Sequence, residues 1–185
     1  MRPKILVASV IVFASVAAPF SISYLSAFQA SDLAPEARLK EMGIELPAPA
    51  ASLAIYKKIV VVDKMAYLSG HIPIDEEGKI MVGKVGKDVD VEFAATAARR
   101  CGIALLATLR GEVGSLNNVK RLVKTTGMVN CSPDVTQQPE VVNGCSQLIV
   151  DVFGEENGKG ARAAVGMSSL PRGAICEIEM IFELH

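Results

Sequence analysis

The sequence predicts an α+β domain in which a mixed β-sheet carries two helices packed on one face. A length of 185 residues suits one domain with a substantial core. Two stretches have the apolar spacing of helices and five shorter ones are β-rich, in the order strand, strand, helix, strand, helix, strand, strand. Helices on one face leave the other open, and an exposed apolar sheet face favours association. We therefore expect a homo-oligomer.

The first two predicted strands form a hairpin. The segment IYKKIVVVDKMAYLSGHIP, residues 55–73, contains two β-rich runs separated by Asp63 and Lys64. Residues 74–90 are rich in glycine and charge, and we expect them to form a surface excursion with a short strand at 80–82.

The two helices are predicted by side chains that recur at helical spacing. Between Val91 and Val113, apolar or small side chains stand at positions 94, 98, 101, 105 and 109, and Gly114 ends the run. The second helix lies within residues 132–155. Its buried face is expected to comprise Val142, Cys145, Ile149 and Val152 or Phe153.

Three further strands complete the predicted sheet. The run VKRLVKTTGMVN, residues 119–130, is β-branched and separates the two helices. The last two strands are expected at Arg162–Met167 and Ala174–Phe182, with residues 170–173, Leu-Pro-Arg-Gly, interrupting them.

The first thirty residues have the composition of a targeting segment or membrane anchor. Two positive charges precede an apolar run, and no charged residue occurs between Lys4 and Asp32. A cleaved secretory signal, an organelle-targeting sequence, a retained anchor spanning residues 5–27 and a packed terminal helix all remain open. Residues 31–53 are interpreted as a helical and Pro/Ala-rich lead-in, and residues 54–185 as the compact domain.

The composition excludes several kinds of site. With 19 Lys and Arg against 20 Asp and Glu, the chain has no overall field that would attract nucleic acid or an anionic membrane. Its four cysteines form no C-x-x-C pair, and its only histidines are His71 and His185. We expect scattered buried thiols and neither a metal nor a cofactor, so any chemistry would rest on Arg, Glu, Tyr, backbone groups and water.

Arg162 and Glu177 are the strongest candidate pair. They lie on the last two predicted strands, which the intervening turn could bring side by side, and Glu177 shares a strand face with Glu179. One interpretation is a cross-strand salt bridge. The other makes Arg162 the planar, two-pronged receptor of a small carboxylate.

Three other residues are candidates for the same site, and a nearby histidine is not. Ser69 and Gly70 end a strand where a missing Cβ leaves room for a ligand, although a tight strand end explains them equally. Tyr56 could cap a pocket or fill core space, and His71 is expected to be a surface or interface hydrogen bonder.

Several motifs together resemble one family. The segments YLSGHIP, VKTTGMVN, VVNGCSQLIVDVFGE and RAAVGMSSLPRGAICEIEM resemble the RidA family, also called the YjgF or endoribonuclease L-PSP family. Its hallmark is R-x-x-V-x-x-x-x-L-P followed by E-x-E, which here runs from Arg162 through Leu170 and Pro171 to Glu177 and Glu179. The resemblance covers the chain from about residue 52 to its end.

The resemblance implies a chorismate-mutase-like fold assembled as a homotrimer with three clefts between subunits. Active members hydrolyse reactive 2-imino acids, such as 2-iminopropanoate and 2-iminobutanoate, to 2-oxo acids and ammonia. The resemblance further implies that Arg162 binds the substrate carboxylate and that Glu177 positions and activates water. With no cofactor or metal, the remaining cleft residues would be Tyr56, Ser69, Gly70, Asn143 and Ala164.

The sequence also departs from the family pattern. Ala164 stands where many members have a cysteine, His71 replaces a common glutamine, and residues 78–88 include extra positions, as in a longer subgroup. Ala164 keeps open a non-catalytic carboxylate-binding or interaction module on the same trimer. An endoribonuclease or translation inhibitor has the least support, because the domain has no basic stripe and few aromatic residues.

Overall fold

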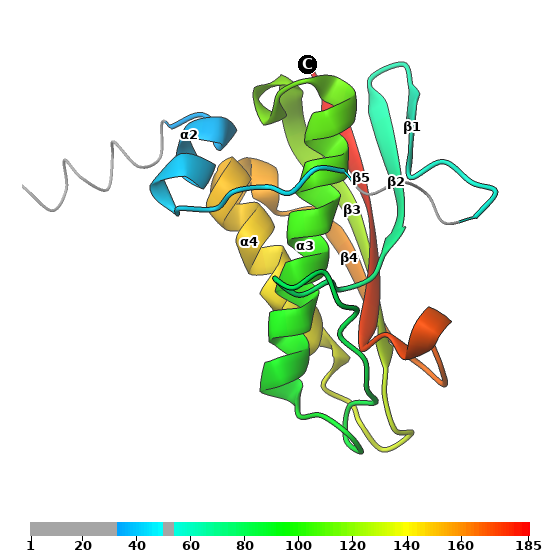
Figure 1. Cartoon of the computed structure of the whole chain (residues 1–185). Helices are drawn as coiled ribbons and strands as arrows, with labels where there is room; N and C mark the ends of the chain where they lie inside the picture. Colours follow the sequence, from blue (N-terminus) through cyan, green and yellow to red (C-terminus); the bar gives the residue numbers. More distant parts are fainter. Residues whose placement is uncertain (1–32, 50–53) are drawn as a thin grey trace, which may run out of the picture. The chain divides into compact units, whose positions relative to one another are not determined.

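The computed structural model describes residues 33–49 and 54–185. Residues 35 to 41 form a short helix, α2, and a five-stranded sheet with two long helices follows (Figure 1). The strands are β1 (Ile59–Val62), β2 (Met65–His71), β3 (Val119–Asn130), β4 (Ala161–Met167) and β5 (Cys176–Leu184), and the long helices are α3 (Val91–Val113) and α4 (Gln138–Gly158). The predicted element order is confirmed. The expectation for residues 1–30 lies outside the described residues.

The sheet is mixed, with the strand order β1-β2-β5-β3-β4. Only β3 and β4 run parallel, and the other neighbours are antiparallel. The expectation that the strands carrying Arg162 and Glu177 lie side by side is therefore wrong, because β3 lies between β4 and β5. The reason is that a parallel crossover through α4 places β4 beside β3 and at the sheet edge.

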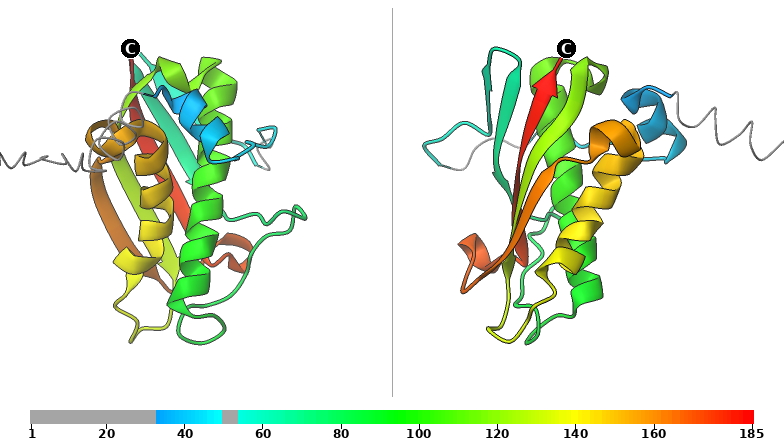
Figure 2. Two further views of the ribbon diagram at one scale, coloured as in Figure 1. Left: turned by 90° about the vertical axis from the view of Figure 1, so that its left-hand side faces the viewer. Right: turned by 180° about the vertical axis from the view of Figure 1, so that it is seen from behind.

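Helices α3 and α4 cover the same face of the sheet (Figure 2). Asp90 caps α3 by accepting a hydrogen bond from the Phe93 amide, and Gly114 ends the helix with φ +79°. The two helices approach so closely that a Cβ added at Gly144 would overlap the Ala95 carbonyl oxygen. This face holds the core, and every residue of the predicted helix stripes is buried, including both Val152 and Phe153.

The lead-in helix α2 packs against the same core. Leu39 and Leu46 are buried, and the Leu116 amide donates a hydrogen bond of 2.8 Å to the Glu36 carboxylate. Glu36 also lies 3.7 Å from the Arg110 guanidinium. Within residues 33–49 and 54–185, no helix has the length and hydropathy that a membrane span requires.

Among the described residues, neither long helix covers the opposite face of the sheet (Figure 2). That face is more polar than expected. Strand alternation places charged and apolar side chains there in neighbouring rows. The expectation of an apolar face is therefore only partly right. Its residues include Tyr67, Lys124, Thr126, Glu177, Glu179 and Ile181.

The excursion between β2 and α3 contains isolated bridges rather than a strand. Ile80 pairs with Ile74, and Val82 pairs with Ala174, each through a single bridge. The predicted short strand at residues 80–82 is thus replaced by two unconnected contacts, because these residues bridge to different segments.

Candidate functional site

Arg162 lies on the helix-covered face of the edge strand β4. It pairs with Thr125 of β3, and its guanidinium donates hydrogen bonds to Asn143 Oδ1 at 2.7 Å and to Ser146 Oγ at 3.2 Å. Both acceptors belong to α4 and are three positions apart, so they lie on one helix face. Within the described part of the chain, no carboxylate lies within ion-pair distance of Arg162.

Ala164 and Gly166 share the helix-covered face with Arg162, because side chains alternate along a strand. Ala164 is partly buried, and its pairing partner on β3 is Gly127. A Cβ at Gly127 would overlap the Val142 side chain, so α4 lies directly over this part of the sheet. We call Arg162, Asn143, Ser146 and Ala164 the arginine half-site.

Glu177 lies on the opposite, open face of the sheet. Its strand neighbours Cys176 and Ile178 are buried under the helices, so alternation turns Glu177 and Glu179 outward. A Cβ at Gly70 would overlap Glu177 Oε1, which shows that the glutamate lies across the Gly70 backbone. Partial burial, reinforced by the charge of Glu179, raises the pKa of Glu177 above its ordinary value.

Ser69 and Gly70 occupy an irregular stretch of β2 beside Glu177. Ser69 Oγ donates a hydrogen bond of 2.7 Å to the Lys57 carbonyl, which ties β2 to the segment before β1. Tyr56 lies in that segment and is 47 % exposed, so the structure does not place it in the core. We call Ser69, Gly70 and Glu177 the glutamate half-site.

His71 is buried rather than a surface residue, and this corrects the sequence expectation. It is 4 % exposed, and its imidazole is hydrogen-bonded to the Ser69 carbonyl oxygen and the Thr108 hydroxyl. Burial, opposed by the hydrogen bond to Ser69 and assisted by the charge of Lys58, lowers the pKa of His71 to about 4. A neutral, enclosed imidazole has no open path to a substrate on the open sheet face.

The two half-sites do not meet within one chain. The arginine half-site lies under α4 at the edge of the sheet, whereas the glutamate half-site lies on the open face with β3 between the two strands. The cross-strand salt bridge considered for Arg162 is therefore absent from the described part of the chain. Ser146 was not identified from the sequence, although its spacing of three from Asn143 is a signal that could have found it.

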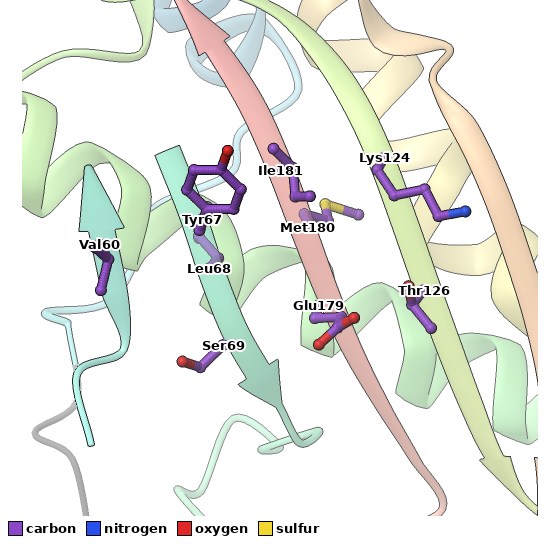
Figure 3. Close-up of a pocket in the computed structure, with 9 residues that line it drawn as sticks. All are labelled: Val60, Tyr67, Leu68, Ser69, Lys124, Thr126, Glu179, Met180 and Ile181. Atoms are coloured by element: carbon purple, nitrogen blue, oxygen red, sulfur yellow. The ribbon is translucent and has the colours of Figure 1, made fainter. Parts of the chain in front are cut away.

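A shallow depression of about 270 Å³ lies on the open face beside the glutamate half-site (Figure 3). It contains Ser69 but neither Glu177 nor Arg162. Its lining residues are Val60, Tyr67, Leu68, Ser69, Lys124, Thr126, Glu179, Met180 and Ile181.

The four cysteines are all free and buried. Burial raises the pKa of the Cys101 and Cys145 thiols, so these side chains stay protonated and are poor nucleophiles. Among residues 33–49 and 54–185, no cluster of three His, Cys, Asp or Glu side chains could hold a metal ion.

Known proteins match the chain over most of its length. The model of the YjgF/chorismate mutase-like endoribonuclease family matches residues 36–184. Protein TCP17 of Trypanosoma cruzi is 40% identical over 149 residues, which cover 80% of this chain and 93% of that protein.

Solved structures match the fold as well. Atu1372 of Agrobacterium tumefaciens, a protein of unknown function, is 40% identical, with 87% of this chain and 99% of that chain covered and a TM-score of 0.74. RidA from the Antarctic bacterium Psychrobacter sp. PAMC 21119 is 27% identical, with 74% and 94% covered and a TM-score of 0.52. The sequence resemblance and the chorismate-mutase-like fold class are thus confirmed.

Proposed function

This chain belongs to the YjgF/chorismate mutase-like endoribonuclease family, and we propose that it hydrolyses reactive 2-imino acids to 2-oxo acids and ammonia. In the proposed reaction, water adds to the C=N carbon, and the resulting carbinolamine releases ammonia as the carbonyl forms. 2-Iminopropanoate and 2-iminobutanoate are the expected substrates. The reaction takes place where two copies of the chain meet.

The arginine half-site supports binding of the substrate carboxylate. Asn143 and Ser146 hold the Arg162 guanidinium through one of its terminal nitrogens, which leaves its other donors for a ligand. A planar guanidinium binds a carboxylate through two parallel hydrogen bonds, and each charge-assisted bond contributes about 1.5 to 3 kcal/mol. Such a contact orients a small acid without binding it tightly.

The glutamate half-site supports activation of water. Partial burial and the nearby charge of Glu179 raise the pKa of Glu177, which makes its carboxylate a stronger base than that of an ordinary glutamate. Gly70 leaves the space that this side chain occupies. Since an imine carbon is already electrophilic, positioning and deprotonating one water molecule is the main catalytic requirement.

The observation that carries the proposal is the placement of Arg162 and Glu177 on opposite faces of one sheet. One substrate cannot contact both residues in a single chain. It can do so when the exposed edge strand of one copy lies against the open sheet face of another, since closed symmetry repeats that contact in every copy. The proposed assembly is a homotrimer, which is what the sequence resemblance implies.

The test generates 2-iminobutanoate in situ with a threonine dehydratase and measures its hydrolysis against the buffer rate, with and without this protein. We expect acceleration by the parent and a large loss in both Arg162→Ala and Glu177→Gln. No acceleration by the parent at micromolar concentration would refute the proposed activity.

Mixing the two inactive variants tests the shared site directly. When Arg162→Ala and Glu177→Gln chains are co-assembled in equal amounts, about one quarter of the sites combine an intact arginine with an intact glutamate. We expect a corresponding recovery of activity. A site built within one chain predicts that no activity is recovered. That outcome would contradict the proposed assembly.

A carboxylate-binding module without turnover is the second candidate, and Ala164 favours it because this position lacks the thiol common in the family. This function predicts that 2-oxobutanoate binds the parent, that Arg162→Ala abolishes binding, and that imine hydrolysis stays at the buffer rate. Calorimetric titration alongside the hydrolysis assay separates the two candidates.

A further inference from the structure

Strand β2 contains a bulge at the glutamate half-site. Leu68 pairs with Met180 and His71 pairs with Ile178, so the step from Leu68 to His71 spans one residue more than the matching step on β5. Leu68 and His71 are both buried as a result, although their spacing of three would place them on opposite faces of a regular strand. Ser69 and Gly70 lie between them.

The His71 side chain links this bulge to helix α3. Its Nδ1 lies 2.7 Å from the Ser69 carbonyl oxygen, and its Nε2 lies 2.8 Å from Thr108 Oγ1. A carbonyl oxygen only accepts hydrogen bonds, so Nδ1 carries the proton of the neutral ring. Nε2 is therefore the acceptor, and the Thr108 hydroxyl donates to it.

The two hydrogen bonds of His71, which we call the His71 bridge, hold the backbone on either side of Gly70, and the Glu177 side chain lies against that backbone. Gly70 stands between Ser69 and His71, and any Cβ at Gly70 would overlap the Glu177 carboxylate. A change in the bulge backbone would therefore move the surface that positions Glu177. Thr108 is itself buried at 6 % exposure, so the end of the bridge on α3 is fixed within the core.

We propose that His71 and Thr108 are positioning residues that hold the Ser69–Gly70 bulge, and through it the Glu177 carboxylate, in place for imine hydrolysis. This role rests on the proposed function. It concerns only the glutamate half-site, because Arg162 is held separately by Asn143 and Ser146. The two half-sites should therefore respond differently when the bridge is broken.

The kinetic test breaks the bridge with Thr108→Val, which removes the hydroxyl at nearly constant volume. We expect kcat to fall about tenfold with KM unchanged, because water activation suffers while carboxylate binding does not. Thr108→Ser restores the hydroxyl and should restore kcat. Thr96→Val on the exposed part of the same helix is the matched control and should behave as the parent, since its hydroxyl bonds only to the Glu92 carbonyl within its own helix.

A second pair of variants covers the case in which Thr108→Val does not fold. The His71→Gln amide has one donor group and one acceptor and could serve both partners, whereas His71→Leu serves neither. We expect His71→Gln to retain most of kcat and His71→Leu to lose about as much as Thr108→Val. Unchanged kcat in both Thr108→Val and His71→Leu, or a rise in KM that accounts for the whole loss, would overturn the positioning role.

Nitrogen-15 NMR of the imidazole tests the bridge without relying on activity. We expect His71 to be the Nδ1–H tautomer, and amide hydrogen exchange at Gly70 and His71 to accelerate in Thr108→Val. An Nε2–H tautomer or unchanged exchange would contradict the anchoring. If the parent shows no turnover, the proposed function fails, and these two measurements still decide whether His71 anchors the bulge.

Discussion

Acidification from about pH 7 to about pH 4.5 should destabilise the protein through His71. The imidazole is buried and neutral, with both nitrogens engaged by Ser69 and Thr108. Its pKa is lowered from an ordinary value of 6.5 to about 4, mainly because burial disfavours the charged ring. The unfolded chain therefore binds a proton on this histidine at a higher pH than the native protein does.

The size of the effect follows from that difference in pKa. One pKa unit corresponds to about 1.4 kcal/mol, so a difference of about 2.5 units corresponds to about 3.5 kcal/mol when His71 titrates fully. Between pH 6.5 and about 4 the unfolded state holds more protons, so the free energy of unfolding falls as the pH falls. Above pH 6.5 this contribution is fully present.

Urea unfolding followed by circular dichroism, at one protein concentration and at both pH values, measures the loss. The His71→Gln variant is the reference, because its amide does not titrate while all carboxylates titrate as in the parent. We expect the parent to lose about 2 to 3 kcal/mol more than His71→Gln between about pH 7 and about pH 4.5. Equal losses would refute the reasoning, since they would mean that His71 titrates alike in the native and unfolded chains.

Two further predictions concern glycines. Gly70→Ala should lower kcat about a hundredfold while changing the free energy of unfolding by less than about 1 kcal/mol, because the added Cβ displaces the movable Glu177 side chain; unchanged kcat in the hydrolysis assay would contradict this. Gly144→Ala should cost about 3 kcal/mol or more in urea unfolding, because its Cβ would overlap the backbone carbonyl of Ala95. Gly114→Ala is the control, because Gly114 has φ +79° and no neighbour within 4 Å, and it should lower the free energy of unfolding by only about 1 kcal/mol. Similar losses in Gly144→Ala and Gly114→Ala would argue against close packing of α3 on α4.

Local signals in the sequence sufficed to predict the individual elements. The apolar spacing between Val91 and Val113 and the glycine after it predicted α3, because the period of 3.6 and the cap are properties of the segment itself. The β-branched run at residues 119–130 predicted β3 with its observed bounds. The start of β5 was placed two residues early, since Ala174 pairs with Val82 of the excursion instead of joining the sheet.

The strand order and the burial of His71 required the tertiary structure. The short turn at residues 170–173 suggested that β4 and β5 lie side by side, whereas β5 pairs with β2 and β3. His71 was expected at the surface or an interface. Its burial could not be predicted, because it depends on a bulge that shifts the alternation of β2 by one residue and that is defined only by the register with β5.

Arg162 and Glu177 illustrate both contributions. The pair, the helices and strands around it and the family motif could all be recognised from the amino-acid sequence. Their placement on opposite faces of the sheet, with β3 between their strands, could be seen only in the folded chain. The physical reason is that a strand's period of two specifies which side chains share a face, while long-range pairing and helix packing determine which face is covered.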